Sequence, residues 1–246
     1  MIITIFSTNN SVDRSIFTIN LAAVFTRNLR RVALVDLTSS MHALNWKTQR
    51  QDANIKPKFT VHDPLGLPLE LENRNSYLRT HYHEIIIDTD GVDSWFAESA
   101  MAASQIIIVP LWHHQDNAKL QEKLIERIER IKLFHPTLQV LIVDMQRPSA
   151  QSDAEARQSD EAAKFTQSIP GAMLADVVMH EWFGARRAFD DGLSIYESNS
   201  RNDRAEAEMK KLYQEILRVK DAPIQAIDSG AATHAIHSII HPKLHA

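Results

Sequence analysis

The chain has 246 residues, of which 44% are apolar and 24% are charged, and its formal net charge is −4. This length and apolar content suffice for one large α/β domain with a buried core. The lack of cysteine excludes disulfides and thiolate metal sites, and it is typical of a reducing cytoplasm. The negative net charge argues against a globally basic nucleic-acid binder, although a local basic face is compatible with it.

No segment is typical of export or of membrane insertion. Residues 2–6 already form a β-branched apolar run and lack the basic and apolar pattern of a signal peptide. No apolar run approaches the roughly 18 residues that span a bilayer. We therefore expect a soluble, cytoplasmic protein without membrane contact.

Short β-branched runs alternate along the chain with longer amphipathic stretches. The predicted strands are 2–6, 32–36, 59–61, 84–88, 105–110, 138–143 and 174–178. The predicted helices are 15–27, 41–50, 68–80, 95–103, 117–133, 153–167, 182–190 and 203–220. This alternation predicts an α/β fold, with a mostly parallel twisted sheet of six to eight strands and helices on both faces.

We expect a single domain over residues 1–220 and a partly mobile tail over residues 221–246, where periodicity is weak. Histidines in this tail recur at a spacing that can bind Zn²⁺ on one helical face. They are His234, His237, His241 and His245. Pro242 interrupts the segment, which favours a solvated tail. His113 and His114 follow a predicted strand, but adjacent histidines point apart and predict no metal site.

The segment between the first predicted strand and helix has the position of a phosphate-binding loop. It reads Asn9, Asn10, Ser11, Val12, Asp13, Arg14 and Ser15. The helix after it contains Asn20, and the next strand ends at Asp36. This order resembles the start of ParA/MinD-family P-loop ATPases, which read strand, KGGxGKT, TxxxNLAxxLA and RVxLxD.

Later segments resemble further landmarks of the same family, in the same order. Trp46 follows the second strand. Residues 82–91, YHEIIIDTDG, resemble the family's YDxIIIDTPP, and residues 103–111, ASQIIIVPL, resemble ADxxIIPVxP. Residues 188–197, AFDDGLSIYE, resemble AFxxGxSVxE. The resemblance covers roughly residues 1–218 and implies a P-loop NTPase-like fold of the ParA/MinD type.

The loop departs from the family pattern where phosphate would bind. A P-loop works because glycines let backbone N–H groups face the phosphates, while a lysine contacts the β- and γ-phosphates and a hydroxyl binds Mg²⁺. This loop has no glycine, Arg14 stands at the lysine position, and Asp13 adds like charge beside the phosphates. Ser15 keeps the hydroxyl, and Asn9 replaces the lysine that crosses the family's dimer. The resemblance therefore implies an ATP and Mg²⁺ site at residues 9–15, and the loop sequence predicts weak nucleotide binding.

Two aspartates stand at the ends of predicted strands. By resemblance, Asp36 would polarise the attacking water, and Asp88 would contact the Mg²⁺ shell together with Ser15. An aspartate at the end of a strand also caps the turn or helix that follows, so both residues keep a purely structural interpretation. Arg14 likewise is either a phosphate ligand or a surface residue at a helix start.

Basic side chains recur in the late helices. Family members bind DNA without sequence preference through basic residues on a nucleotide-assembled homodimer. The candidates here are Arg186, Arg187, Lys210, Lys211 and Arg218. Glutamates such as Glu208 and Glu215 are interleaved with them, which also fits a solvated, salt-bridged helix face.

Two functional interpretations follow. The first is a ParA-like protein of plasmid or DNA partition or of conjugative DNA transfer, with weak or absent ATP hydrolysis. Its partners would be nonspecific DNA, a second copy of the chain, and a plasmid-encoded centromere-binding or relaxosome protein. The second is a catalytically inactive pseudo-ATPase that serves as a protein-interaction scaffold. The loop favours the second for the chemistry, and the landmarks favour the first for the biological context.

Overall fold

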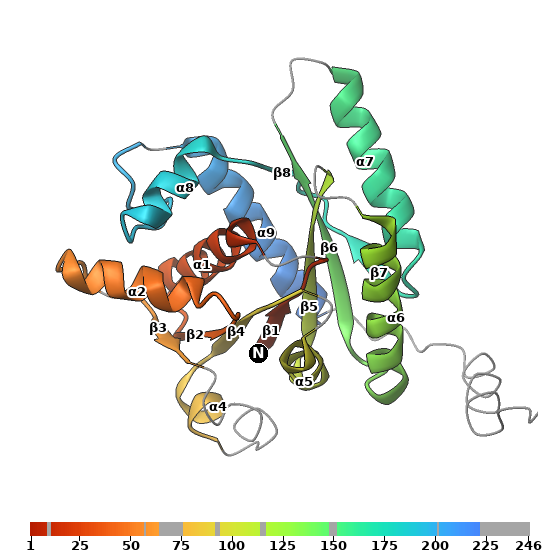
Figure 1. The fold of residues 1–246 in the computed structure, drawn as a ribbon, viewed down its shortest axis with the longest axis horizontal. Helices are drawn as coiled ribbons and strands as arrows, with labels where there is room; N and C mark the ends of the chain where they lie inside the picture. Colours follow the sequence, from red (N-terminus) through yellow and green to blue (C-terminus); the bar gives the residue numbers. More distant parts are fainter. Residues whose placement is uncertain are drawn as a thin grey trace, which may run out of the picture.

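A computed structural model describes residues 1–8, 11–56, 58–63, 76–91, 94–113, 117–147, 152–200 and 202–221. Within these residues, eight strands form one sheet in the order β3-β2-β4-β1-β5-β6-β7, and β8 also pairs with β6 (Figure 1). Every strand pairing is parallel. The α/β architecture and the strand number predicted from the sequence are confirmed.

The strands are β1 (Ile2–Ile5), β2 (Val32–Leu37), β3 (Thr60–His62), β4 (Glu84–Thr89), β5 (Ile106–Trp112), β6 (Gln139–Gln146), β7 (Ala172–Leu174) and β8 (Met179–His180). The helices are α1 (Val12–Arg27), α2 (His42–Asp52), α4 (Tyr77–His81), α5 (Trp95–Ala103), α6 (Ala118–Phe134), α7 (Ser152–Gln167), α8 (Phe183–Asp190) and α9 (Asp203–Asp221). The first six strands and most helices lie within a few residues of their predicted positions.

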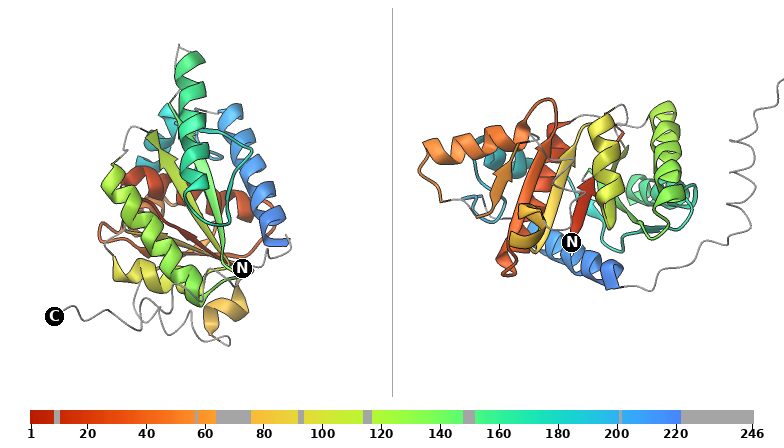
Figure 2. Two further views of the ribbon diagram at one scale, coloured as in Figure 1. Left: turned by 90° about the vertical axis from the view of Figure 1, so that its right-hand side faces the viewer. Right: turned by 90° about the horizontal axis from the view of Figure 1, so that it is seen from below.

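Helices cover both faces of the sheet because strands that are apolar on both sides must be shielded on both sides. One face is packed by α1, α2, α8 and α9, and the other by α4, α5, α6 and α7 (Figures 1 and 2). Figure 2 also shows α7 projecting beyond the rest of the described chain. No described helix is long and apolar enough to cross a membrane.

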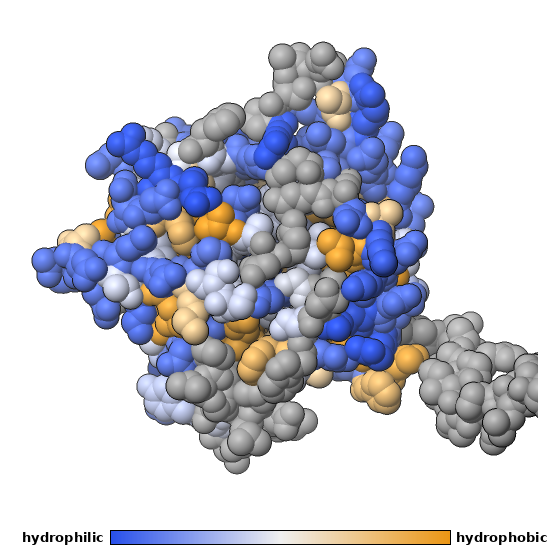
Figure 3. Space-filling model, in the orientation of Figure 1, coloured by the Kyte–Doolittle hydropathy of each residue, from blue (hydrophilic) through white to orange (hydrophobic). Residues whose placement is uncertain are grey.

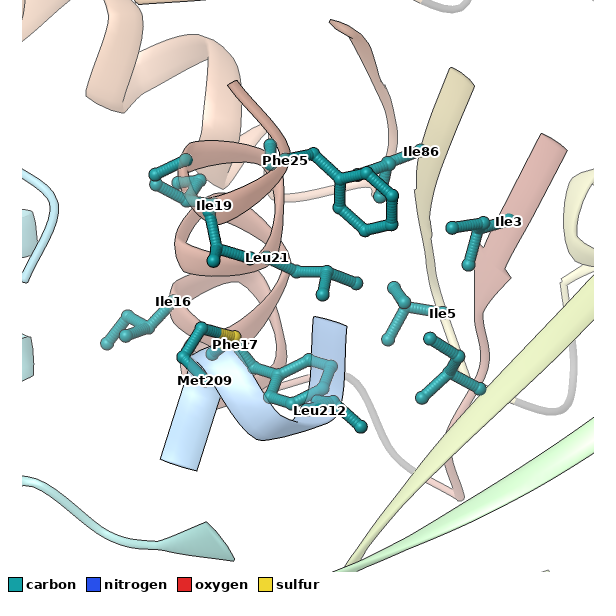
Figure 4. Close-up of a cluster of buried hydrophobic side chains, with 14 of the residues drawn as sticks. Ile3, Ile5, Ile16, Phe17, Ile19, Leu21, Phe25, Ile86, Met209 and Leu212 are labelled. Atoms are coloured by element: carbon teal, nitrogen blue, oxygen red, sulfur yellow. The ribbon is translucent and has the colours of Figure 1, made fainter. Parts of the chain in front are cut away.

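Helix α1 lies at the centre of the larger core. Its side chains Phe17 and Leu21 fill the space between the sheet and α9, where they meet Ile5 and Leu212 (Figure 4). Twelve residues of α1 are buried. Because α1 is enclosed on several sides, the position of its first turn is set by packing as well as by its own hydrogen bonds.

The last predicted strand is wrong in its position. The apolar run at residues 174–178 predicted one strand, but the structure has β7 before it and β8 after it. Between them, the backbone N–H groups of Asp176 and Val177 donate to the Glu215 carboxylate of α9 at 2.9 and 3.0 Å. These donors are therefore bound to a side chain instead of to β6, and the strand is interrupted.

One predicted helix starts at a different residue in the structure, and another lies mostly outside the described residues. Helix α1 begins at Val12, three residues before the predicted start. Residues 64–75, which hold most of the helix predicted at 68–80, lie outside the described residues, and α4 is the described helix at its end. The predicted tail, with its histidines, also lies outside the described residues from 222 onward.

Candidate functional site

The first turn of α1 takes up most of the predicted loop. Ser11 is the N-cap, and its hydroxyl accepts a hydrogen bond from the Arg14 N–H at 3.4 Å. A serine in this position satisfies one of the free N–H groups at a helix start, which explains the early beginning of α1. Asn9 and Asn10 lie outside the described residues. Val12 and Asp13 open the helix, with Asp13 as the acidic residue of its first turn.

Arg14, Ser15 and Asp88 form one buried cluster. Arg14 Nε donates to Asp88 Oδ1 at 2.8 Å, and Ser15 Oγ donates to Asp88 Oδ2 at 2.5 Å. Arg14 Nη1 also reaches the Ser7 hydroxyl at 3.4 Å. The side chains of Arg14 and Asp88 are both 0% exposed. Arg14 is therefore an interior residue, and the surface interpretation from the sequence is wrong.

Burial raises the pKa of the Asp88 carboxyl above the ordinary aspartate value, while the Arg14 charge and the hydrogen bonds from Ser15 and Arg14 act in the opposite direction. In this arrangement both carboxylate oxygens are engaged within the protein. The Ser15 hydroxyl donates its proton to Asp88, and the lone pairs of its oxygen remain able to bind a cation. In this arrangement the Arg14 guanidinium is bound by Asp88 and Ser7, so it does not fit the phosphate-binding role of the family's lysine.

Asp36 is adjacent to this cluster, because β2 and β4 pair with Asp36 opposite Asp88. Its carboxylate accepts hydrogen bonds from Thr38 N at 3.0 Å and from Thr38 Oγ1 at 2.6 Å. It also accepts from the backbone N–H groups of Ala43 and Leu44 at 2.8 and 3.1 Å. Asp36 thus caps α2, whose own N-cap residue, Met41, provides no side-chain hydrogen bond.

A hollow of about 210 Å³ opens beside the first turn of α1, at the carboxyl ends of β5 and β6, and is called the edge hollow below. Open α/β sheets bind ligands at this edge. Its walls are apolar and largely aromatic, and four charged or titratable side chains line it as well. The lining residues are Asp13, Ile16, Phe17, Trp112, Met145, His180, Glu181, Trp182, Ala185 and Arg186. Figure 3 shows that the surface over α7 and α8 is hydrophilic and that apolar patches lie nearer the middle of the view.

Solved structures share this fold, although no family model and no curated protein sequence matches the chain. One is described as a plasmid partition protein of Borrelia burgdorferi B31 bound to AMPPNP, with a TM-score of 0.60, 15% identity, and coverage of 89% of this chain and 99% of that chain. A chain of the MinC:MinD cell division complex of Aquifex aeolicus has a TM-score of 0.64 and 9% identity, over 91% and 98% of the two chains. MinD of Pyrococcus furiosus has a TM-score of 0.57 and 19% identity, over 88% and 98%.

The fold is that of ParA/MinD-type ATPases. At these identities the likeness concerns the fold, and it confirms the fold that the sequence landmarks predicted. Three residue assignments stay predictions. They are Asp36 as a catalytic residue, Ser15 with Asp88 as Mg²⁺ ligands, and the nucleotide-binding residues Asn9, Asn10, Ser11, Val12, Asp13, Arg14 and Ser15.

The ParA/MinD-like landmarks that are distant in the sequence meet in space. The Asn20 side chain accepts from Ile195 N at 2.9 Å, and Trp46 Nε1 donates to Leu193 O at 3.2 Å. Arg50 donates to Glu197 at 2.9 and 3.0 Å and to Gly192 O at 2.8 Å. These contacts join α1 and α2 to the segment after α8. The sequence showed the landmark residues without showing that they bind each other.

Gly192 lies in the segment after α8 at a position where only glycine fits. It has a φ of +69°, and a Cβ added there would lie 2.8 Å from Arg50 N. A side chain at this position would therefore be strained and would collide with the backbone of α2. Arg50 itself is 2% exposed.

His113 belongs to a second polar cluster of this chain, which lies near the carboxyl ends of β5 and β6. Its Nε2 lies 2.7 Å from Asp144 Oδ1, and its Nδ1 lies 3.3 Å from Glu161 Oε2 of α7. Gln146 Nε2 donates to the other Asp144 oxygen at 2.7 Å. His114 lies outside the described residues. Sequence reasoning missed Asp144, and the available signal was that His113 and Asp144 both lie near the carboxyl ends of neighbouring strands.

The basic residues predicted to contact DNA lie on two helices. Arg186 and Arg187 belong to α8, and Arg186 Nε lies 3.4 Å from Asp190. Lys210, Lys211 and Arg218 belong to α9, where all three are exposed. Arg218 lies 3.9 Å from Asp176.

Two of the interleaved glutamates do not lie on the solvated face that the sequence suggested. Glu208 and Glu215 are buried, each 7% exposed. Glu208 accepts from His180 N at 3.0 Å and from Arg204 Nε at 2.8 Å. Two of the negative charges on α9 are therefore directed into the fold, whereas Lys210 and Lys211 remain on the surface.

Proposed function

We propose that the chain is a ParA-like protein of plasmid or DNA partition, or of conjugative DNA transfer, in which ATP hydrolysis is weak or absent. The buried Arg14, Ser15 and Asp88 cluster carries the second part of this proposal. It joins the lysine position, the Mg²⁺-hydroxyl position and the strand aspartate of the family pattern to one another.

Electrostatics supports the same conclusion. A phosphoryl-transfer site needs cationic groups that remain available to the phosphates. The Arg14 charge is already paired with Asp88 at 2.8 Å. To bind phosphate, Arg14 would have to leave Asp88 as an unpaired buried carboxylate, which is costly. The Asp13 carboxylate in the same turn adds repulsion.

The biological context is supported by the neighbours of the fold, which include a plasmid partition protein bound to AMPPNP and a MinC:MinD complex. By analogy, we propose that the chain forms a homodimer and binds a plasmid-encoded partner protein and nonspecific DNA. The nucleotide in the partition-protein structure supports some nucleotide binding at the equivalent position, and the Arg14 arrangement opposes tight binding.

Calorimetry with ATP and Mg²⁺ and a steady-state phosphate-release assay test this proposal. We expect affinity no better than the high micromolar range and hydrolysis near background. A matched variant replaces residues 9–15 with KGGVGKT while keeping Asp36 and Asp88. It should bind nucleotide more tightly, because phosphate donors are restored and Asp13 is gone.

Low-micromolar ATP affinity in the natural chain, with turnover abolished by Asp36→Ala, would overturn the proposal. If the rebuilt chain folds but still ignores ATP, the roles inferred for Asp36 and Asp88 are wrong. The alternative function is a nucleotide-independent interaction scaffold. It is favoured by the Arg14–Asp88 pair, which joins α1 to β4 without a ligand.

A further inference from the structure

The edge hollow has aromatic walls and a carboxylate that no other described residue pairs with. Phe17, Trp112 and Trp182 line it together with Asp13. The electron-rich faces of tryptophan and phenylalanine attract organic cations, and tryptophan does so most strongly. Asp13 forms no ion pair within the described part of the chain, unlike the other titratable groups around the hollow.

Those other groups are neutralised by neighbours. Glu181 accepts from Arg147 Nε at 2.8 Å, and His180 Nδ1 lies 2.8 Å from Glu208 Oε1. Arg186 is paired with Asp190 at 3.4 Å, and more than half of its side chain is exposed. Among the described residues that line the hollow, Asp13 is thus the charged group without an ion-pair partner.

We propose that the edge hollow binds a compact organic cation, a guanidinium or a quaternary ammonium group, between its aromatic walls and Asp13. The cation is either a free small molecule or an arginine side chain of a partner protein. Its positive charge is stabilised by the Asp13 carboxylate, and its apolar surface contacts the tryptophans. The same carboxylate repels phosphate groups, so the hollow disfavours a nucleoside triphosphate.

The inference rests on the proposed function in one respect, namely that no polyphosphate occupies the adjoining first turn of α1. The test uses the full chain with tetramethylammonium and with N-acetyl-arginine amide as probes, followed by calorimetry and by tryptophan fluorescence. ATP with Mg²⁺ and adenosine are titrated in parallel. A preference for the arginine amide identifies a guanidinium side chain as the occupant, and a preference for tetramethylammonium identifies a free quaternary amine.

Two charged residues at the hollow allow a test of sign. Asp13→Asn should weaken binding of the preferred cation about fivefold, which corresponds to about 1 kcal/mol. Arg186→Gln should strengthen it, because a cation is removed from the rim and Asp190 loses its ionic partner. Asp153→Asn is the matched control, since Asp153 is an exposed acidic residue in the first turn of α7. It should leave the affinity unchanged.

The opposite pattern, with Asp13→Asn strengthening and Arg186→Gln weakening binding of ATP, would identify an anionic ligand and overturn the inference. No saturable binding of either cation in the millimolar range, or equal affinity in all variants, would overturn it too. Failure of cation binding without ATP binding leaves the proposed function intact. Tight ATP binding with turnover contradicts the proposed function independently. Melting temperatures of the variants show whether each one is folded.

Discussion

Arg14 places a permanent positive charge in a part of the molecule that is closed to solvent. A buried ion pair seldom adds much stability compared with apolar residues of the same size, but removing one partner leaves an uncompensated charge. The contacts of Arg14 with Asp88 and Ser7 satisfy its guanidinium in place of a ligand. At this position an arginine therefore has a structural role that the family's lysine does not suggest.

Arg14→Gln should lower the free energy of unfolding by about 3–5 kcal/mol near neutral pH, because Asp88 loses its counter-charge. The direction of the pH dependence follows from Asp88, whose pKa is raised by burial. A raised carboxyl pKa favours the fold at low pH and penalises it as pH rises. The deficit of the variant should therefore grow between about pH 4 and pH 7.

Urea unfolding monitored by circular dichroism measures this effect. The double variant R14Q with D88N should recover part of the loss, since no charge then remains buried. A deficit that is the same at both pH values, or a double variant no more stable than R14Q, would show that the pair does not act as described.

The backbone of Leu29 is in a strained conformation, and its side chain gains no burial in return. It follows the C-terminus of α1 with a φ of +61°, and it is 90% exposed. Its N–H donates to Thr26 O at 3.0 Å, and Arg30 N donates to Phe25 O at 3.2 Å. The turn that ends α1 therefore needs a left-handed residue, which glycine adopts without steric cost.

Leu29→Gly should raise the free energy of unfolding by about 0.5–1 kcal/mol, because the cost of the left-handed conformation disappears. Leu29→Ala is the matched control. It removes the exposed side chain but keeps the Cβ, so it should give no comparable gain. Thermal unfolding of the three proteins decides the matter, and equal gains for both variants would assign the effect to lost apolar exposure instead of to backbone strain.

At the scale of secondary structure elements, the sequence predicted what depends on local periodicity. The six strands from β1 to β6 are apolar runs bounded by polar residues, and their positions follow from that pattern alone. The strand predicted at 174–178 failed because Glu215, some 40 positions later, binds the N–H groups of Asp176 and Val177. No local pattern carries information about a competing side chain that distant.

The same limit applies to the candidate site. The resemblance assigned Asp36 and Asp88 to one nucleotide site, and the register of β2 and β4 places the two residues opposite each other. The sequence did not indicate that Arg14 turns inward onto Asp88, because a helix-start arginine has solvent as an equally good alternative. The capping interpretation of Asp36 is confirmed, because Asp36 accepts from the N–H groups of Ala43 and Leu44 at the start of α2.

Glu197 joins two elements through Arg50 of α2. Burial alone would raise the pKa of its carboxyl, but the hydrogen bonds from Arg50 and from Ser194 outweigh burial and hold the pKa below the ordinary glutamate value. A carboxyl with a lowered pKa in the folded state stabilises the fold above its unfolded pKa. That stabilisation is lost as pH falls through the folded value.

Glu197→Gln should therefore destabilise the protein at neutral pH, by about 1–3 kcal/mol for a lost charged hydrogen bond, and much less under acid conditions. The measurement is the unfolding free energy of both proteins as a function of pH. Glu126→Gln on α6 is the control, because Glu126 is an exposed side chain on a helix that covers the opposite face of the sheet from α2. Curves that run parallel down to the acid end would contradict the role assigned to Glu197.

At the scale of the whole molecule, α1 connects every part of the candidate site. Its first turn holds Arg14 against β4 and borders the edge hollow, and its middle contacts the segment after α8 through Asn20. These contacts are complete in the chain by itself. We therefore expect α1 to keep its position with or without nucleotide.

If the position of α1 does not depend on nucleotide, DNA binding should not depend on it either. In the family pattern, ATP assembles the dimer that brings basic residues together, and a lysine crosses that dimer. This chain has Asn9 at the lysine position, and Arg14 is paired internally. Any DNA binding should therefore be indifferent to ATP, whereas the exposed cations of α9 remain available with or without nucleotide.

We expect weak binding to nonspecific duplex that falls steeply with salt, as counterion release requires. Replacing Lys210 and Lys211 by alanine should weaken it and reduce the log–log salt slope by about 2, whereas Arg218→Ala should have a smaller effect because Arg218 lies near Asp176. The control is the double alanine variant of Lys119 and Lys164, two exposed lysines on α6 and α7. Gel shifts with and without ATP measure all of this. ATP-stimulated binding would restore a nucleotide-driven partition mechanism, and absence of binding at low salt would leave the interaction scaffold as the function of this fold.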